Sequence, residues 1–265
     1  LDVVDVKNVL KQDNIKLPPG GDEEFALSFY APHDKGRLVV AQVDTGSTFQ
    51  VHARKQDHGE MYSVWERDVD GQLSLAPIYD AAAKQILFST SLKVRRVSVR
   101  NGKEDAGWDF TIFLPQNWSA DGRGNLYVIG THMEESGKKR SVLLALTLAG
   151  KELWRWSGSP KLVSWSKRQP PIVGLDGMIH AFSGQSVLTF KEGKLLWDLK
   201  MAPTYGTALS DGTLLVTSGN SLMRLNKDGE KLYTVALGKP ALTPPVVDGN
   251  GDVYVATTTE LVKIN

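Results

Sequence analysis

The stretch VVDGNGDVYVAT, residues 246–257, raises the question of whether it is a calcium loop or a tight turn. It begins like an EF-hand loop, because its two aspartates and its asparagine alternate as the oxygen ligands of a hard cation do. The sixth position of such a loop is a glycine and the twelfth a glutamate, but here they are Val253 and Thr259. The pattern therefore favours a turn that leads into a strand.

Similar stretches occur elsewhere in the chain, each an acidic or small turn followed by an apolar run. Besides the copy at 246, they begin at His33, Tyr79, Ala120, Leu175 and Ser210. A metal site would need its oxygen ligands in every copy, but Arg123 or Thr213 stands where Asn250 does. What recurs is turn chemistry, in which Asp starts the reversal, Gly supplies a positive φ and an alternating strand follows.

The repeat has the period of a propeller blade. Its first strand residues are Leu38, Ile86, Leu126, Met178, Leu214 and Val253, with an average spacing of 43 residues. A second element follows each strand, in which an aromatic residue lies four positions after a glycine. Its clearest copies are Gly150 with Trp154, Gly193 with Trp197, and Gly229 with Tyr233. Each unit then supplies four short strands, named A to D.

A four-stranded sheet cannot bury both of its faces alone, and stacking such sheets around an axis solves that problem. We therefore expect an all-β fold, a β-propeller of six four-stranded blades in one domain, residues 1–265. The last unit ends at strand C, so its strand D is expected from the N-terminal residues 1–8 or from residues 13–17. A seven-bladed propeller or a fragment of a larger propeller is the alternative.

Composition excludes several classes of function. Lysine plus arginine (31) balances aspartate plus glutamate (30), so the net charge of +1 favours neither nucleic acid nor an anionic membrane. No apolar run approaches the roughly 18 residues of a transmembrane segment. Without cysteine there is no disulfide, thiolate nucleophile or zinc-thiolate site.

The remaining residues carry no motif for catalysis or metal binding. The five histidines, His33, His52, His58, His132 and His180, show no common metal-ligand spacing. There is no Gly-x-Ser-x-Gly nucleophile elbow and no glycine loop that would cradle a phosphate. We therefore expect no catalytic residue and no metal site.

The units around Gly150, Gly193 and Gly229 resemble the repeat of PQQ-like (quinoprotein-type) β-propellers, and residues 244–255 fit the second part of that repeat. The resemblance is good over residues 143–265 and weak before about residue 90. It implies docking tryptophans that tie adjacent blades together, which assigns Trp154, Trp197 and Trp108 to structure.

Enzymes of that family bind a quinone cofactor with calcium beside a vicinal cysteine disulfide, and no cysteine exists here. The resemblance therefore implies the non-enzymatic branch, similar to the periplasmic scaffold of outer-membrane protein assembly and to cell-surface sensor propellers. It implies no PQQ or calcium, and an extracytoplasmic location with the leader removed.

The strand order places the A to B and C to D turns on one face of the propeller and the longer B to C and D to A connections on the other, where recognition usually resides. Aromatic residues beside basic ones on these connections are expected to bind a protein segment or a small polar ligand. The candidate residues are Trp165, Lys167, Arg168, Trp118, Tyr205, Lys239, Lys138 and Arg140. The simpler interpretation of Trp165 is that it packs under its own loop.

Two other functions stay open at this point. One is a propeller enzyme, a quinone- or metal-dependent oxidoreductase, hydrolase or lyase with a site in the central channel. The other is a purely structural domain of a larger chain.

Overall fold

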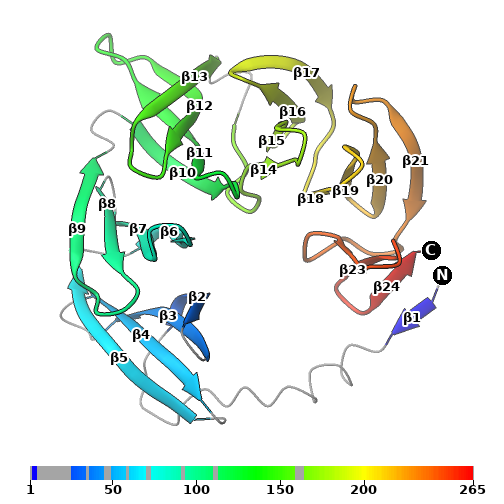
Figure 1. Ribbon diagram of the computed structural model, residues 1–265. Coiled ribbons are helices and arrows are strands. Elements are labelled where there is room, and N and C mark those ends of the chain that lie inside the picture. The colour runs from blue at the N-terminus through cyan, green and yellow to red at the C-terminus, as the bar shows by residue number, and fades with distance from the viewer. Residues whose placement is uncertain are drawn as a thin grey trace. The chain divides into compact units, whose positions relative to one another are not determined.

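The computed structural model describes residues 2–4, 25–33, 36–44, 49–57, 60–69, 73–90, 93–109, 113–158 and 164–264 (Figure 1). All regular secondary structure within these ranges consists of β-strands, which confirms the expected all-β class. In the same ranges no helix is long and apolar enough to cross a membrane. The contacts of the chain divide it into two compact units.

One unit comprises Lys16–Lys138 and Leu144–Leu153. It contains a sheet of β2 (Phe25–His33), β3 (Gly36–Asp44), β4 (Phe49–Asp57) and β5 (Glu60–Val69). It also contains a sheet of β6 (Leu73–Asp80), β7 (Gln85–Thr90), β8 (Lys93–Ser98) and β9 (Glu104–Asp109). A third sheet is formed by β10 (Phe113–Ala120), β11 (Asn125–Met133), β12 (Lys139–Thr147) and β13 (Glu152–Gly158), and the last two strands contribute to both units.

The other unit comprises Leu1–Ile15, Lys139–Leu143 and Trp154–Asn265. It contains a sheet of β14 (Ile172–Val173), β15 (Ile179–Phe182), β16 (Ser186–Lys191) and β17 (Lys194–Lys200). The next sheet consists of β18 (Tyr205–Ala208), β19 (Leu214–Ser218), β20 (Ser221–Leu225) and β21 (Lys231–Ala236). The last sheet is β22 (Val246–Val247), β23 (Val253–Ala256), β24 (Leu261–Ile264) and β1 (Asp2–Val4).

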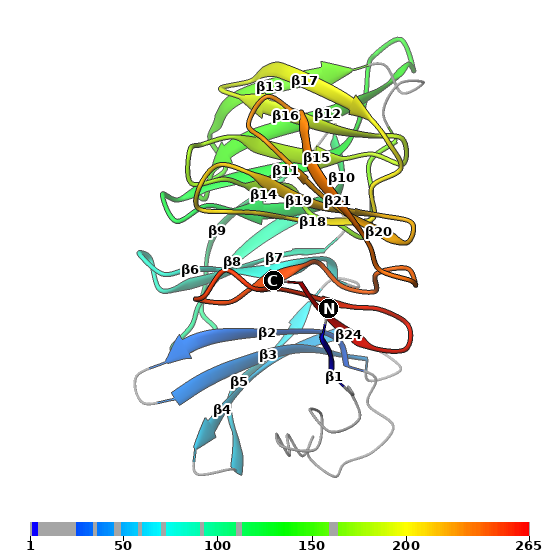
Figure 2. The same cartoon turned by 90° about the vertical axis from the view of Figure 1, so that its right-hand side faces the viewer.

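The last sheet takes its outer strand from the other end of the sequence. β1 pairs antiparallel with β24, with Asp2 opposite Lys263, Val3 opposite Val262 and Val4 opposite Leu261 (Figure 2). This confirms the first of the two expected sources of strand D, and the second, residues 13–17, lies outside the described residues. The described ranges thus form six sheets of four strands. The number of blades in the propeller stays a prediction.

Seven hairpins of the described ranges share one five-residue turn. The N–H of its first residue donates to the C=O of its fifth, and the N–H of a glycine at position four donates to the C=O of the first. Copies begin at Asp121, Glu134, Thr147, Gly174, Leu209, Asn226 and Asp248. The glycines have φ between 76° and 88°, the geometry of a type I turn closed by a left-handed residue. The expected role of glycine is therefore confirmed in these copies.

One of the expected turns differs, and another is not described. In the copy at Tyr79 no glycine is present, and Lys84 takes the positive φ of 52° instead. There the Asp80 carboxylate closes the turn by accepting hydrogen bonds from the N–H groups of Ala82 and Ala83 at 3.1 and 3.0 Å. The turn that follows His33 includes residues 34–35, which lie outside the described residues.

Where side-chain burial is described, the core lies on the inner strands of the sheets. In β15 every residue is buried, in β7 and β19 all but one are, and the middle of β11 is likewise buried. These strands are covered on both faces, which explains their nearly continuous apolar runs. The outer strands β17 and β21 are mostly exposed. The sheets of β14–β17 and β18–β21 therefore have buried inner strands and a solvent-facing outer strand.

A tryptophan on each of four outer strands packs against a turn glycine of the next sheet. The pairs are Trp65 with Gly102, Trp108 with Gly150, Trp154 with Gly193, and Trp197 with Gly229. A methyl group on these glycines would lie only 2.5 to 3.4 Å from the nearest tryptophan atom. Trp65 and Trp197 also donate their indole N–H to turn carbonyls, those of Val99 and Lys227. The predicted docking role of Trp108, Trp154 and Trp197 is confirmed, and Trp65, which was not predicted, makes the same contact.

Candidate functional site

The Asp248 turn answers the question raised by residues 246–257. Oδ1 of Asp248 accepts hydrogen bonds from the N–H groups of Asn250 and Asp252 at 2.8 and 3.0 Å, and Oδ2 accepts one from the Tyr254 hydroxyl at 3.3 Å. Desolvation opposes ionisation of Asp248, but these hydrogen bonds prevail and lower its pKa. The carboxylate thus serves the turn itself, as the turn interpretation predicts.

The same arrangement recurs at Asp121. Its Oδ1 accepts hydrogen bonds from the N–H groups of Arg123 and Asn125, both at 2.8 Å, and its Oδ2 accepts one from the Tyr127 hydroxyl at 3.2 Å. Burial, together with the charge of Asp121, raises the pKa of Tyr127 to about 12, so this phenol stays a donor. Two copies with one bonding pattern support a structural role for both aspartates.

Trp165 does not have the exposed position expected of a binding aromatic. Its side chain is only 5% exposed, and its indole packs edge-on against Trp156 with the ring centroids 6.0 Å apart. The cause is local, because the connection that carries it forms an antiparallel bridge with Ser183. The expected exposure of Trp165 is therefore wrong, and its burial agrees with the simpler interpretation, although residues 159–163 of its loop lie outside the described residues.

The basic residues after Trp165 do reach solvent. Lys167 and Arg168 are exposed, whereas the next residue, Gln169, is buried and accepts a hydrogen bond from the Gly206 N–H at 3.2 Å. The N–H of Ser166 donates to the C=O of Phe182 at 2.8 Å. The two cations thus lie on a backbone segment anchored at both ends, which we call the 164–169 link.

Three further candidates belong to the same unit as this link. Tyr205 begins β18 and is half-buried, and its N–H donates to the Thr217 hydroxyl at 3.1 Å. Lys239 is exposed on a second connection, which is anchored in the same way by a bridge between Ala241 and Thr257. Arg140 is half-buried on β12.

The remaining two candidates lie in the other unit. Trp118 was expected on a connection, but it lies within β10 and is only 3% exposed, so its expected role as an exposed aromatic is wrong. Its indole N–H donates to the C=O of Ala76 at 2.6 Å, which ties β10 to the neighbouring sheet. Lys138 is exposed at the fifth position of the turn that begins at Glu134.

Of the histidines, His180 is the most informative. It lies in a strand, β15, as its alternation predicts, and it is buried there, with its Nδ1 2.7 Å from the Thr189 hydroxyl. Burial lowers the pKa of His180 to about 4, so the ring is neutral at physiological pH. The side chains of His33 and His52, and the whole of His58, lie outside what the structure describes.

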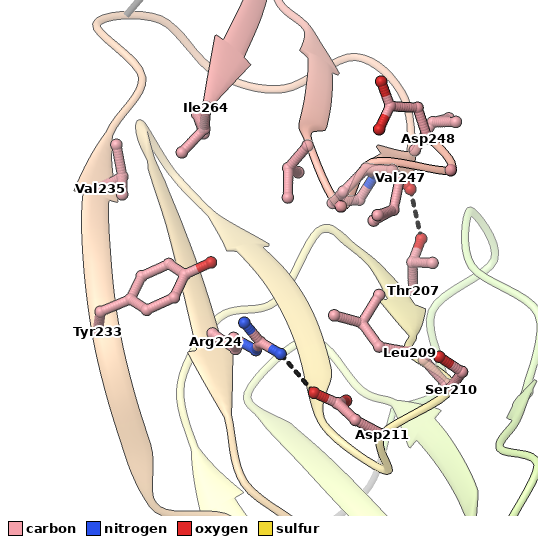
Figure 3. Close-up of a pocket in the computed structure, with 16 residues that line it drawn as sticks. Thr207, Leu209, Ser210, Asp211, Arg224, Tyr233, Val235, Val247, Asp248 and Ile264 are labelled. Carbon is pink, nitrogen blue, oxygen red and sulfur yellow. Dashed lines mark hydrogen bonds and ion pairs between the residues drawn. The ribbon is translucent and has the colours of Figure 1, made fainter.

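A cavity of about 980 Å³ lies on the side of the short turns, between the β18–β21 sheet and the last sheet (Figure 3). Its apolar lining includes Val235, Val247 and Ile264. Tyr233 extends into it from β21, opposite Arg224 on β20. The sequence interpretation treated the short-turn side as scaffold and did not select this cavity.

The cavity carries a polar group of three charged residues. Arg224 donates to Asp211 at 2.5 Å and, through Nε, to the Thr213 hydroxyl at 3.0 Å. Hydrogen bonds from the Thr213 hydroxyl and N–H, aided by Arg224, lower the pKa of Asp211. Asp248 is the other charged residue of the lining, and its pKa is lowered as well. Two carboxylates and one guanidinium leave the cavity with an excess of negative charge.

Comparison with known proteins supports the repeat and the fold. Residues 139–265 match the family model described as outer membrane protein assembly factor BamB. No curated protein sequence matches the chain. Solved structures similar to it include a Bacteroides caccae protein of unknown function, with 17% identity and a TM-score of 0.53 over 82% of this chain and 86% of that one.

Two further structures are similar at lower identity. BamB from Moraxella catarrhalis is 13% identical, with a TM-score of 0.50 over 91% of this chain and 98% of that one. The C-terminal WD40 domain of Sif2 is 10% identical, with a TM-score of 0.56 over 92% and 82%. At these identities the likeness shows the fold alone. The chain therefore has a β-propeller fold, and its residues 139–265 carry the PQQ-like repeat that their glycines and aromatics predict.

Proposed function

We propose that the protein is a non-enzymatic interaction propeller that binds a protein segment through the long-connection side of its sheets. The observation that carries this proposal is the match of residues 139–265 to a family described as an outer membrane protein assembly factor. The proposal places the protein outside the cytoplasm, where that family resemblance points, and treats residues 1–265 as one domain.

The 164–169 link supplies the geometry for such binding. Its backbone is held by hydrogen bonds from Ser166 to Phe182 and from Gly184 to Ser164, at 2.8 and 2.9 Å. A segment that is ordered before binding loses little conformational entropy when a partner arrives. Lys167 and Arg168 then present two positive charges from a fixed position, which favours an acidic partner segment.

The candidates Lys239, Tyr205 and Arg140, which lie in the same unit as the 164–169 link, belong to the proposal as secondary contacts. Trp165 is buried and helps to hold this link in place. Lys138 and Trp118 lie in the other unit, where Lys138 stays a candidate contact and Trp118 is buried. A small polar ligand is the alternative occupant that the same cations would attract.

Site-specific crosslinking in cells of the source organism tests the proposal. A photoreactive residue in place of Arg168 is expected to crosslink one protein partner, while the same residue in place of Lys191 is not. Lys191 is also exposed and basic but ends β16 at a short turn. Equal crosslinking at both positions, or none at Arg168, would contradict the proposal.

Charge reversal provides a second measurement. The Lys167→Glu/Arg168→Glu double variant should lower recovery of that partner at least tenfold, while Lys191→Glu/Lys227→Glu, with the same change in net charge, should not. The proposed function requires neither PQQ nor calcium. Metal analysis and the absorbance spectrum of the purified protein test whether either is bound. A stoichiometric ion or quinone would favour an enzyme instead.

A further inference from the structure

The aromatic residue on the outer strand of the β18–β21 sheet, Tyr233, differs from the tryptophans on the outer strands of the four preceding sheets. Trp65, Trp108, Trp154 and Trp197 each lie against a glycine in the C to D turn of the next sheet. Tyr233 occupies the same position on β21, four residues after Gly229, but no glycine of the described ranges lies over its ring. Its side chain is 36% exposed and lines the cavity between the last two sheets.

The strand pairing explains this difference. In the preceding sheets strands C and D are consecutive, so a hairpin turn joins them and covers the neighbouring aromatic. In the last sheet strand C is β24 and strand D is β1, which come from opposite ends of residues 1–265. No turn within these residues joins them. The cavity at Tyr233 therefore lies where the C to D turn of the last sheet would otherwise pack.

We propose that this cavity is a docking site for a glycine-containing β-turn of a partner protein. The four internal contacts show what such an aromatic ring accommodates, which is a turn glycine with positive φ, and in three of the four a Cβ on this glycine would lie within 2.5 to 2.8 Å of the ring. A side chain at that glycine would overlap the ring, because a Cβ on Gly229 would lie 2.8 Å from Trp197 Cδ2. The cavity thus selects glycine at the centre of the turn.

The charge of the cavity specifies the residue after that glycine. Three of the internal turns continue with lysine, at Gly102-Lys103, Gly150-Lys151 and Gly193-Lys194. The cavity is lined by Asp211 and Asp248 and by a single cation, Arg224, which is already bonded to Asp211. An excess of negative charge favours a cationic residue in the incoming turn. The partner is therefore a protein that presents a Gly-Lys β-turn.

The apolar lining fits the rest of such a hairpin. Val235 follows Tyr233 on the same face of β21, and Ile264 and Val253 extend the lining from the last sheet. Apolar residues that flank the turn, as Leu148 and Leu153 flank Gly150-Lys151, would bury surface there. This site is separate from the 164–169 link, so the two proposals fail independently.

A cyclised hairpin peptide of residues 145–153, ALTLAGKEL, is a suitable probe, because it contains one of the internal turns. Fluorescence anisotropy of the labelled peptide should show saturable binding to the protein. Peptides with Ala in place of Gly150 or Glu in place of Lys151 should bind at least tenfold more weakly.

Variants of the protein locate the binding. Tyr233→Ala should weaken binding of the peptide at least tenfold, and Tyr233→Trp, which restores the residue of the other sheets, should retain it. Leu232→Ala is the matched control, since Leu232 is the neighbouring residue, is 53% exposed and does not line the cavity. The Lys167→Glu/Arg168→Glu variant should bind the peptide normally. Circular dichroism confirms that each variant is folded.

Three results would overturn this proposal. The first is no saturable binding of the Gly-Lys peptide, and the second is equal binding by the wild type and Tyr233→Ala. The third is a dimer in light scattering that Tyr233→Ala dissociates, because the occupant would then be a second copy of the chain.

Discussion

Substitution of Gly229 by alanine tests the contact that joins neighbouring sheets. Gly229 has φ +82°, and an added Cβ would lie 2.8, 3.0 and 3.1 Å from Cδ2, Cε3 and Cε2 of Trp197. Two costs therefore combine. The left-handed backbone costs alanine about 1 kcal/mol after allowance for the unfolded chain, and overlap with a fixed ring adds about 1–3 kcal/mol.

Gly251 is a matched control, because the backbone cost alone applies there. It occupies the same position of the same turn with φ +88°, and a Cβ would meet nothing within 4 Å. Gly251→Ala should therefore lower the free energy of unfolding by about 1 kcal/mol, and Gly229→Ala by about 2–4 kcal/mol. The difference of about 2 kcal/mol corresponds to roughly 4–8 °C in Tm for a chain of this size.

Urea denaturation followed by circular dichroism measures both values. A second pair of variants attributes the difference to the ring: in a Trp197→Ala background, Gly229→Ala should cost no more than Gly251→Ala, within about 0.5 kcal/mol. If the two glycine variants are equally stable in the wild-type background, the tryptophan does not restrict this turn and the docking argument fails.

Three further outcomes are expected. The pKa of His180 is about 4 in the fold and 6.5 in the unfolded chain, so its contribution to the free energy of unfolding is complete above pH 6.5 and decreases as the pH falls toward 4. Between pH 7.5 and 5 the free energy of unfolding of the wild type should therefore fall by about 2 kcal/mol more than that of His180→Gln. Equal decreases in urea titrations would contradict this. Removal of residues 1–4 exposes the edge of β24 and should lower the Tm of one cooperative transition in calorimetry, while an unchanged Tm would mean that β1 does not close the last sheet. Trp118→Phe removes the bond to Ala76 and should cost about 1 kcal/mol by thermal unfolding, whereas an unchanged stability would mean that this bond contributes nothing.

The elements that could be predicted from the sequence depend on neighbouring residues. The turn at Asp248 forms through hydrogen bonds between groups at most six positions apart, so its residues specify it directly. The blade period and the aromatic four positions after each glycine follow from repetition of such units. The pairing of β1 with β24 joins the two ends of the chain, yet it was predictable because the last repeat visibly lacks a strand.

The candidate site was predicted less well, because exposure depends on groups distant in the chain. Trp118 is buried through a bond to Ala76, 42 positions earlier, and the 164–169 link is fixed by pairing with residues 182–184. A tryptophan beside basic residues has the same local sequence whether it is exposed or buried. The motif could therefore select Lys167 and Arg168 but could not place Trp165.

Local sequence patterns thus predict the repeats, the turn glycines and the docking tryptophans, because each arises from short-range hydrogen bonds or from a recurring spacing. The cavity at Tyr233 is different. It lies between two sheets where no turn joins β24 to β1, and its lining combines residues of β18, β20, β21, β22, β23 and β24. Only packing between strands that are far apart in the chain determines which aromatic is covered by a glycine and which one lines a cavity.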